Sequence, residues 1–157
     1  MTRIFSQLNE DMDLYKMAMT YIYTTRGIPQ VYYGTEILMT GPSDHGSLRA
    51  DFPGGWSTDK INAFDGQGLK PQQKSAQGFI KKLLNWRKES FPITKGEFIH
   101  FHPSDGDYVY FRKYDDELVM VLMNNNNKTK NISTDRFFEI LALHSSQQFR
   151  HYWMSYY

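Results

Sequence analysis

The first half of the chain begins with a helical pattern of apolar residues. Residues 9–25 (NEDMDLYKMAMTYIYTT) carry apolar side chains on almost every face, so a helix there needs partners on several sides. Carboxylates crowd its start, where the helix dipole favours negative charge. We therefore predict a helix over this segment, capped by Asn9 and ended by Gly27.

A short β-like run follows this helix. Residues 28–33 (IPQVYY) are rich in β-branched and aromatic side chains and too few for another helix, so they predict a strand. Helix, tight turn and apolar strand together are typical of a parallel α/β fold. A polar loop over residues 37–68, dense in Gly, Pro, Asp and Ser, comes next. A loop of this length inside a compact protein is usually functional, or else it contains elements that the pattern does not reveal.

The clearest helical pattern lies at residues 71–90. One face carries lysine, glutamine and asparagine, and Pro71 suits the first turn, so we predict an amphipathic helix that stops at Phe91-Pro92. The apolar face is formed by Ala76, Phe79, Ile80, Leu83 and Leu84.

Beyond this helix the apolar period changes to two, which predicts an antiparallel meander of strands joined by the turn-like stretches SDGD and YDDE. Residues 135–141 fit a short helix or an anchoring segment, and residues 143–157 show no clear period. The expected strands cover residues 96–103, 107–115, 117–124 and, as a fourth, 128–134.

The change of period near residue 92 predicts two domains, residues 1–92 and 93–157, and the fold class α+β.

The chain has 157 residues, 40% of them hydrophobic and 16% aromatic, enough for a packed core. A net charge of +1 gives no electrostatic case for nucleic acid. Cysteine is absent, which excludes disulfides and zinc thiolates, and no apolar run is long enough to cross a membrane. The first residues lack the apolar core of a signal peptide, and the compartment stays undetermined.

Several motifs together resemble one enzyme family. GIPQVYYGTE resembles the eighth strand of the (β/α)8 barrel in the α-amylase superfamily of glycoside hydrolases, and EILMTGPSDHGSLRADFPGGW is similar to its neopullulanase and cyclomaltodextrinase branch. LLNWRKES resembles the eighth barrel helix, and EFIHFHPSDGDYVYFRKYDDELVMVLMNNN is similar to the C-terminal all-β domain. The resemblance covers about residues 1–141, and the sequence after Leu141 departs from it.

The resemblance implies a C-terminal portion of such an enzyme. Arg3 matches an arginine that follows an Asn-His-Asp triplet in the family, and the triplet itself is absent from this chain, as are the nucleophilic aspartate and the acid/base glutamate. Residues 1–92 would then be the last part of the barrel, and residues 93–157 an incomplete β-sandwich-like domain. Retaining glycosidases need two carboxyl groups about 5–5.5 Å apart. We therefore expect no catalytic residue, no cofactor and no hydrolysis by this chain alone. The implied partner of the parent enzyme, which in bacteria is often exported, is an α-glucan or cyclodextrin.

Four residues are candidates for the edge of the parent's substrate site. Glu36 follows the predicted strand, where barrel carboxylates face the site, or is a structural carboxylate paired with an arginine or backbone amides. Arg49 offers a forked donor for sugar hydroxyls, and Asp51 lies beside it; alternatively the two form a loop-stabilising ion pair. Trp56 suits stacking on a pyranose ring, or anchors the loop by burial.

Other polar residues fit structural explanations better than functional ones. His45 has no second histidine at ligand spacing, and His100 with His102 fits a half-exposed strand face, so we predict no metal site. Asp115 and Asp116 look like a catalytic pair but fit a hairpin turn. Tyr108, Tyr110 and Arg112 share one face of a predicted strand. This face either binds sugar or packs against the barrel.

Two other functions remain open. The chain could be a non-catalytic carbohydrate-binding module that uses Trp56. It could also be an interaction fragment, because a barrel strand without neighbours exposes unpaired backbone groups and would favour homo-oligomers through the barrel edges.

Overall fold

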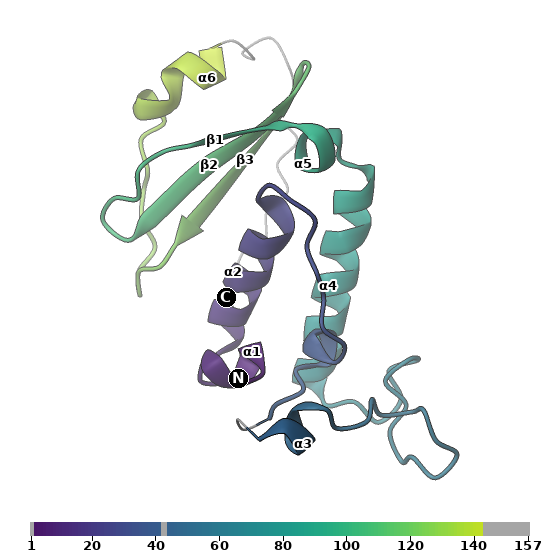
Figure 1. Ribbon diagram of the computed structural model, residues 1–157. Helices are drawn as coiled ribbons and strands as arrows, with labels where there is room; N and C mark the ends of the chain where they lie inside the picture. Colours follow the sequence, from purple (N-terminus) through teal and green to yellow (C-terminus); the bar gives the residue numbers. More distant parts are fainter. Residues whose placement is uncertain (1, 42–43, 143–157) are drawn as a thin grey trace. The chain divides into compact units, whose positions relative to one another are not determined.

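Figure 1 shows the computed structural model, which describes residues 2–41 and 44–142. The chain divides into two compact units, which we call the helical unit (Met1–Glu89) and the sheet unit (Ser90–Tyr157). No helix in the described part of the chain combines the length and hydropathy that a membrane span requires. Helices and a three-stranded antiparallel sheet together give the α+β class that the sequence predicts.

The helical unit opens with α1 (Ile4–Gln7) and α2 (Met12–Thr24). The predicted cap of α2, Asn9, is wrong. Asn9 and Glu10 have positive φ and reverse the chain after α1. The N-cap of α2 is therefore Asp11, which has an extended backbone. Its carboxylate accepts hydrogen bonds from the backbone amides of Asp13 (2.8 Å) and Leu14 (2.9 Å).

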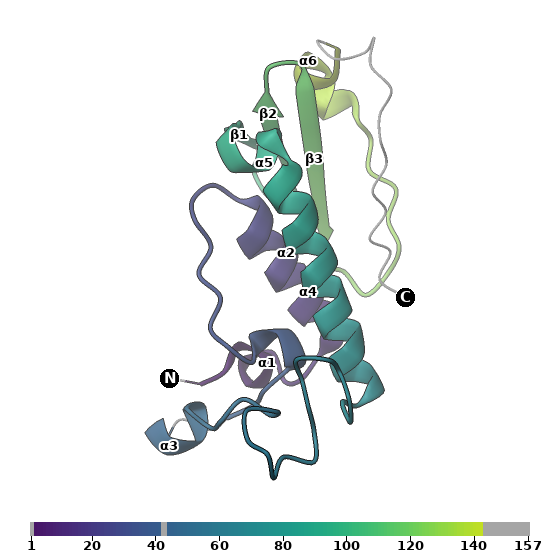
Figure 2. The ribbon, with the colours of Figure 1, turned by 90° about the vertical axis from the view of Figure 1, so that its right-hand side faces the viewer.

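Helix α4 (Pro71–Glu89) confirms the amphipathic prediction and packs along α2 (Figures 1 and 2). Arg87 joins the two helices, because its guanidinium donates to the carbonyl oxygens of Tyr23 (2.5 Å) and Gly27 (3.0 Å) at the end of α2. Buried side chains line both inner faces, at Tyr15, Met19, Tyr23, Ala76, Ile80 and Leu83.

The strand predicted at residues 28–33 does not form. The backbone groups of residues 28–31 make no hydrogen bond to the described residues, and Ile28 is 99% exposed. A strand exists only by pairing, and the one sheet among the described residues, β1-β2-β3, does not include this segment. The segment is extended and leads into the 3₁₀ helix η1 (Thr35–Ile37).

The sheet unit begins with α5 (Phe91–Lys95), so Phe91-Pro92 starts a new helical turn after α4. The meander is confirmed: β1 (Glu97–His100), β2 (Asp107–Tyr114) and β3 (Glu117–Asn124) pair antiparallel in that order. Asp105 and Gly106 turn the first hairpin with positive φ. Asp115 does the same in the second hairpin, which confirms its prediction as a turn residue.

The fourth strand expected over residues 128–134 is also wrong. Side-chain amides redirect the chain after β3, since Asn124 Nδ2 donates to the Lys128 carbonyl (3.0 Å) and Asn126 Nδ2 donates to the Asp105 carbonyl (2.9 Å). The chain then runs as coil to η2 (Asp135–Phe137) and α6 (Phe138–Ala142), which confirms the helix expected there. Residues 143–157, for which we expected no regular period, lie outside the described residues.

Phe137 fixes this last helical segment to the sheet. Its ring is buried and meets the rings of Phe101 (4.8 Å) and Phe111 (5.7 Å), next to Val109. The sheet unit therefore has a core of its own on one face of β2.

Candidate functional site

The long polar loop of the helical unit is held to the body of that unit at two points. Ala63 in the loop and Leu69 directly after it are buried in a small core with Ile37. Two glutamines of α4 reach into it: Gln73 Nε2 donates to the Ile37 carbonyl (3.0 Å), and Gln77 Nε2 donates to the Ala63 carbonyl (2.6 Å). The loop is thus a built structure, which agrees with a functional interpretation of its length.

Residues 51–67, which we call the aromatic loop, fold back on themselves. The Ala63 amide donates to the Pro53 carbonyl (3.0 Å), and the Asn62 amide donates to the Gln67 carbonyl (2.9 Å). Gly54 has a φ of +105°, and a Cβ atom there would lie 2.9 Å from Asn62 Cα. Only glycine lets the two arms of the loop approach so closely.

Trp56 projects from the first arm and is 64% exposed. Its backbone amide donates to Asp59 Oδ2 (3.1 Å), which also accepts from the Gly54 amide (2.7 Å). The indole Nε1 donates to Asp51 Oδ2 (3.1 Å). Among the described residues the ring is therefore oriented by a carboxylate and open to solvent.

The loop-stabilising ion pair suggested for Arg49 and Asp51 is also wrong. Asp51 is engaged by the indole of Trp56, and the exposed Arg49 side chain makes no hydrogen bond or ion pair with the described residues. Arg49 follows α3 (His45–Leu48), whose first turn is capped by Asp44. The Ser47 hydroxyl and the amides of Ser47 and Gly46 hold the pKa of the Asp44 carboxyl below its usual range.

Glu36 lies in η1, near Tyr15 and Tyr23 of α2. Burial is the main reason why the pKa values of Tyr23 and Tyr15 are raised, and the negative charge of Glu36 adds to both effects. The Tyr15 hydroxyl donates to the neighbouring Thr35 carbonyl (2.9 Å). Glu36 Oε2 is buried and accepts no hydrogen bond from the described residues, so the expected arginine or amide partner is not found among them.

Arg3 is a residue whose role the sequence pattern missed. Its buried guanidinium lies over the rings of Tyr32 (4.7 Å) and Tyr33 (4.8 Å). It donates to the Tyr33 carbonyl and, at 2.7 Å, to the Leu48 carbonyl. Arg3 therefore ties residues 32–33 to the end of α3, directly before Arg49. The consecutive tyrosines Tyr32 and Tyr33 were the signal in the sequence that could have indicated this role, because arginine side chains stack on aromatic rings.

The histidines in the described part of the chain do not gather at one site. His45 is exposed at the start of α3, and His100 packs on the rings of Phe98 (5.7 Å) and Tyr108 (6.4 Å). Among the residues that the structure describes, no three His, Cys, Asp or Glu side chains converge in a way that could hold a metal ion.

The suggested sugar-binding strip on β2 is wrong, because Tyr110 and Arg112 are buried. The Arg112 guanidinium caps α5: it donates to the carbonyl oxygens of Pro92 (3.2 Å), Ile93 (2.9 Å) and Gly96 (2.8 Å). Its role is structural, within the sheet unit.

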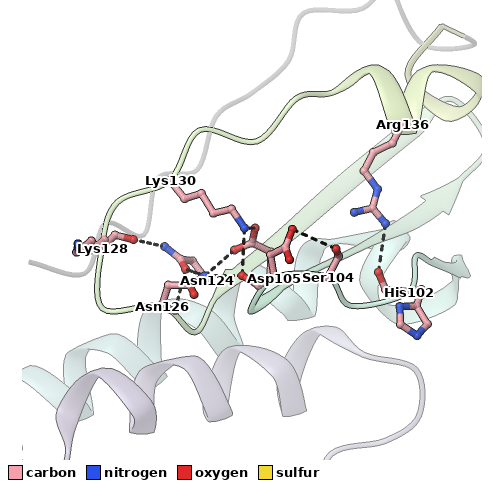
Figure 3. A network of polar contacts seen from close by, with 9 residues as sticks. His102, Ser104, Asp105, Asn124, Asn126, Lys128, Lys130 and Arg136 are labelled. Carbon is pink, nitrogen blue, oxygen red and sulfur yellow. Dashed lines mark hydrogen bonds and ion pairs between the residues drawn. The ribbon is translucent and has the colours of Figure 1, made fainter.

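A second polar region lies at the β1–β2 turn of the sheet unit (Figure 3). Lys130 Nζ forms an ion pair with Asp107 Oδ2 (2.7 Å) and donates to the Asp105 carbonyl (3.1 Å). An open hollow of about 460 Å³ lies beside it. Asn126 Nδ2 bonds within the same cluster, so these groups satisfy one another and hold the coil after β3 in place. The hollow is lined by Asp105, Asn126, Asn127, Lys128, Thr129 and Lys130.

Comparison with known proteins places the chain in a family. Residues 98–148 match the model of the cyclo-malto-dextrinase C-terminal domain. The α-amylase of Geobacillus thermoleovorans, whose structure holds acarbose, aligns with a TM-score of 0.61 and 30% identity over 82% of this chain and 26% of its own. This chain belongs to the α-amylase superfamily.

Other superfamily members agree with this assignment. The cyclomaltodextrinase of Thermoanaerobacter pseudethanolicus is 29% identical over 72% of this chain and 17% of its own length. The cyclomaltodextrin glucanotransferase of Niallia circulans is 30% identical over 77% of this chain and 16% of its own. The chain thus spans less than a fifth of the length of either relative, and it corresponds to the C-terminal part of superfamily enzymes.

Proposed function

We propose that this chain is the C-terminal portion of a bacterial enzyme of the neopullulanase and cyclomaltodextrinase type that hydrolyses α-glucans or cyclodextrins. Residues 1–92 are the last part of its (β/α)8 barrel, and residues 93–157 are its C-terminal β domain. The names of the relatives, cyclomaltodextrinase and α-amylase, support the substrate class. The observation that carries the proposal is the exposed Trp56 ring, oriented by Asp51 on a loop anchored to α4.

Trp56 is the principal ligand contact in this proposal. An exposed indole offers a flat apolar face to the C–H side of a pyranose ring, and its orientation is set before the ligand arrives. Arg49, which has no partner among the described residues, donates to sugar hydroxyls, and Asp51 positions the indole. Glu36 lies deeper, at the base of the loop, where its buried oxygen accepts from a donor of the complete enzyme.

The chain by itself hydrolyses nothing in this proposal. The loop carboxylates Asp44, Asp51, Asp59 and Asp65 each accept hydrogen bonds from the loop's own groups, which assigns them to shaping the loop. Retaining hydrolysis requires two carboxyl groups across one bond, supplied in a TIM barrel by several different strands.

The experiment is calorimetric titration of the 157-residue chain with β-cyclodextrin and maltoheptaose, together with a reducing-sugar assay. We expect binding in the micromolar to millimolar range, loss of that binding in Trp56→Ala, and no release of reducing sugar. Absence of binding by the wild-type chain would refute the substrate-site proposal. Hydrolysis by a clean preparation would refute the inactivity.

A second candidate function, protein interaction, is favoured by one observation. Residues 28–31 leave their backbone groups without a partner among the described residues. The exposed apolar side chains of the segment are Ile28, Val31, Tyr32 and Tyr33. Such a segment pairs with another strand when one is supplied, which in a separate chain would be a second copy. Sedimentation of the purified chain tests this: a monomer at all concentrations contradicts it.

A further inference from the structure

We propose that Phe64 is a second stacking contact for the same α-glucan ligand, on the arm of the aromatic loop opposite Trp56. This inference rests on the proposed function and extends it by one residue. Phe64 has no polar atom in its side chain, so its contribution would be contact with the apolar face of a sugar ring.

The first support is the exposure of the ring together with its backing. Phe64 is 72% exposed, more than Trp56. Its ring meets that of Phe52 at 4.9 Å with an angle of 57° between the planes. Phe52 in turn packs on the buried cluster that contains Ile37 and Ala63. The ring therefore has a firm base and most of its surface in water.

The second support is the rigidity of the turn that carries the ring. The Phe64 amide donates to Asn62 Oδ1 (3.0 Å), and Asn62 Nδ2 donates to Asp65 Oδ2 (3.0 Å). Asp65 Oδ1 accepts from the Gln67 amide (2.8 Å). The polar residues before and after Phe64 form the hydrogen bonds of this turn, so the turn itself requires no aromatic side chain. An exposed phenylalanine held in a fixed place loses little conformational entropy when a ligand covers it.

The third support is the connection to Trp56. Pro53 and Ala63, hydrogen-bonded at 3.0 Å, hold the two arms together, and Gly54 lies in contact with Asn62. Trp56 follows Gly54 by two residues on one arm, and Phe64 follows Asn62 by two residues on the other. The two exposed rings are therefore carried by arms of the loop that are hydrogen-bonded to each other.

The charges of the aromatic loop point to a neutral ligand. Asp51, Asp59 and Asp65 outnumber the cations of the site, which are Lys60 and the neighbouring Arg49. This excess of negative charge opposes nucleotides, nucleic acids and anionic lipid surfaces, whereas sugar hydroxyls donate to carboxylates. A neutral polyol with an apolar face, such as an α-1,4-linked glucan, fits both the charges and the rings.

The test compares three alanine variants of the 157-residue chain by calorimetric titration with maltoheptaose and β-cyclodextrin. Phe138→Ala is the matched control, because Phe138 is 68% exposed but lies in α6 of the sheet unit. We expect Phe64→Ala to weaken binding about tenfold, which corresponds to about 1.4 kcal/mol. Trp56→Ala should abolish binding, and Phe138→Ala should leave it unchanged. Phe64→Tyr, which keeps an aromatic ring at this position, should bind like wild type. Far-UV circular dichroism checks that each variant folds.

Failure of the inference is distinguishable from failure of the proposed function. If Trp56→Ala loses binding and Phe64→Ala binds like wild type, Phe64 is not a contact and the proposed function stands. If the wild-type chain binds neither ligand, both proposals fall. If Phe64→Ala leaves binding intact but shifts a monomer–dimer equilibrium in sedimentation, the ring contacts a second copy, and the inference is overturned.

Discussion

At the scale of single residues, several arginine side chains in this protein donate hydrogen bonds to backbone carbonyl oxygens. Arg87 donates to the end of α2, Arg3 to residues 33 and 48, and Arg112 to the end of α5. A fork of donors on a planar group suits this task, because several carbonyl oxygens are reached from one side chain. These three arginines therefore contribute to stability, whereas the exposed Arg49 is the candidate for ligand chemistry.

Arg112→Met should destabilise the sheet unit by about 2–3 kcal/mol, because buried carbonyl oxygens of α5 would lose charged donors. Urea unfolding followed by circular dichroism measures the change. Arg136→Met is the control, since Arg136 is exposed and donates at 3.2 Å to one carbonyl, that of His102 (Figure 3). Equal effects of the two substitutions would contradict the capping role.

Tyr15 should make the protein sensitive to alkaline pH. Burial, followed by the nearby Tyr23 and Glu36, raises the pKa of Tyr15 well above its ordinary value of 10.0. A raised pKa in the folded state means that the neutral hydroxyl is favoured. Its contribution is complete below pH 10 and is lost as the pH rises beyond that value.

Tyr15→Phe should cost about 1 kcal/mol at neutral pH, because the hydrogen bond to the Thr35 carbonyl is lost. The same variant should lose less stability than wild type when the pH rises above 10. Urea midpoints measured at pH 7 and at pH 10–11 check both statements. A parallel decline in the two proteins would show that Tyr15 does not titrate with unfolding.

At the scale of elements, the aromatic loop is shaped by close contacts between its arms and by side chains from α4. Two glycines that follow each other provide a matched pair of probes. Gly54 has a φ of +105° and touches Asn62, whereas a Cβ at Gly55 would meet its nearest neighbour at 3.6 Å, an ordinary contact.

Gly54→Ala should therefore disorder the loop, at a local cost of about 1–3 kcal/mol, and Gly55→Ala should be tolerated. Amide hydrogen exchange at Asn62 and Ala63, whose amides bond across the loop, reports the effect directly. Cyclodextrin affinity should fall with Gly54→Ala alone. Unchanged exchange in that variant would contradict the account of the close approach.

At the scale of the whole molecule, the described part of the chain has two units, each with its own buried residues, and one unpaired β-like segment. Residues 28–33 are rich in β-branched and aromatic side chains, the composition of a buried strand. Apolar side chains and free backbone groups in water favour association.

If residues 28–33 join two copies of the chain, Val31→Lys should shift the equilibrium toward monomer, because a charge would enter the contact. Phe138→Lys, at another exposed apolar position, should not. Sedimentation velocity over a concentration series measures the difference. Dimers that persist in Val31→Lys would place the contact elsewhere.

Local patterns in the sequence were sufficient to predict several elements. The helix at residues 71–89 and the three-stranded meander follow from apolar periods of 3.6 and 2, which depend only on neighbouring residues. The turn role of Asp115 likewise follows from local hydrogen bonding. The superfamily was also readable from motif order, because the spacing of GIPQVYYGTE and the later strands is a property of the sequence itself.

Tertiary structure decided the features that depend on distant partners. Residues 28–33 had the composition of a strand, but pairing requires a second strand, and none of the described strands pairs with them. Asp51 could have paired with Arg49 or with Trp56, and the folding of the loop selected the indole. Phe64 was not predicted as a contact, since its exposure depends on Phe52 and on the arm opposite. Sequence periodicity determines which elements form locally, whereas the site depends on which residues the fold brings together.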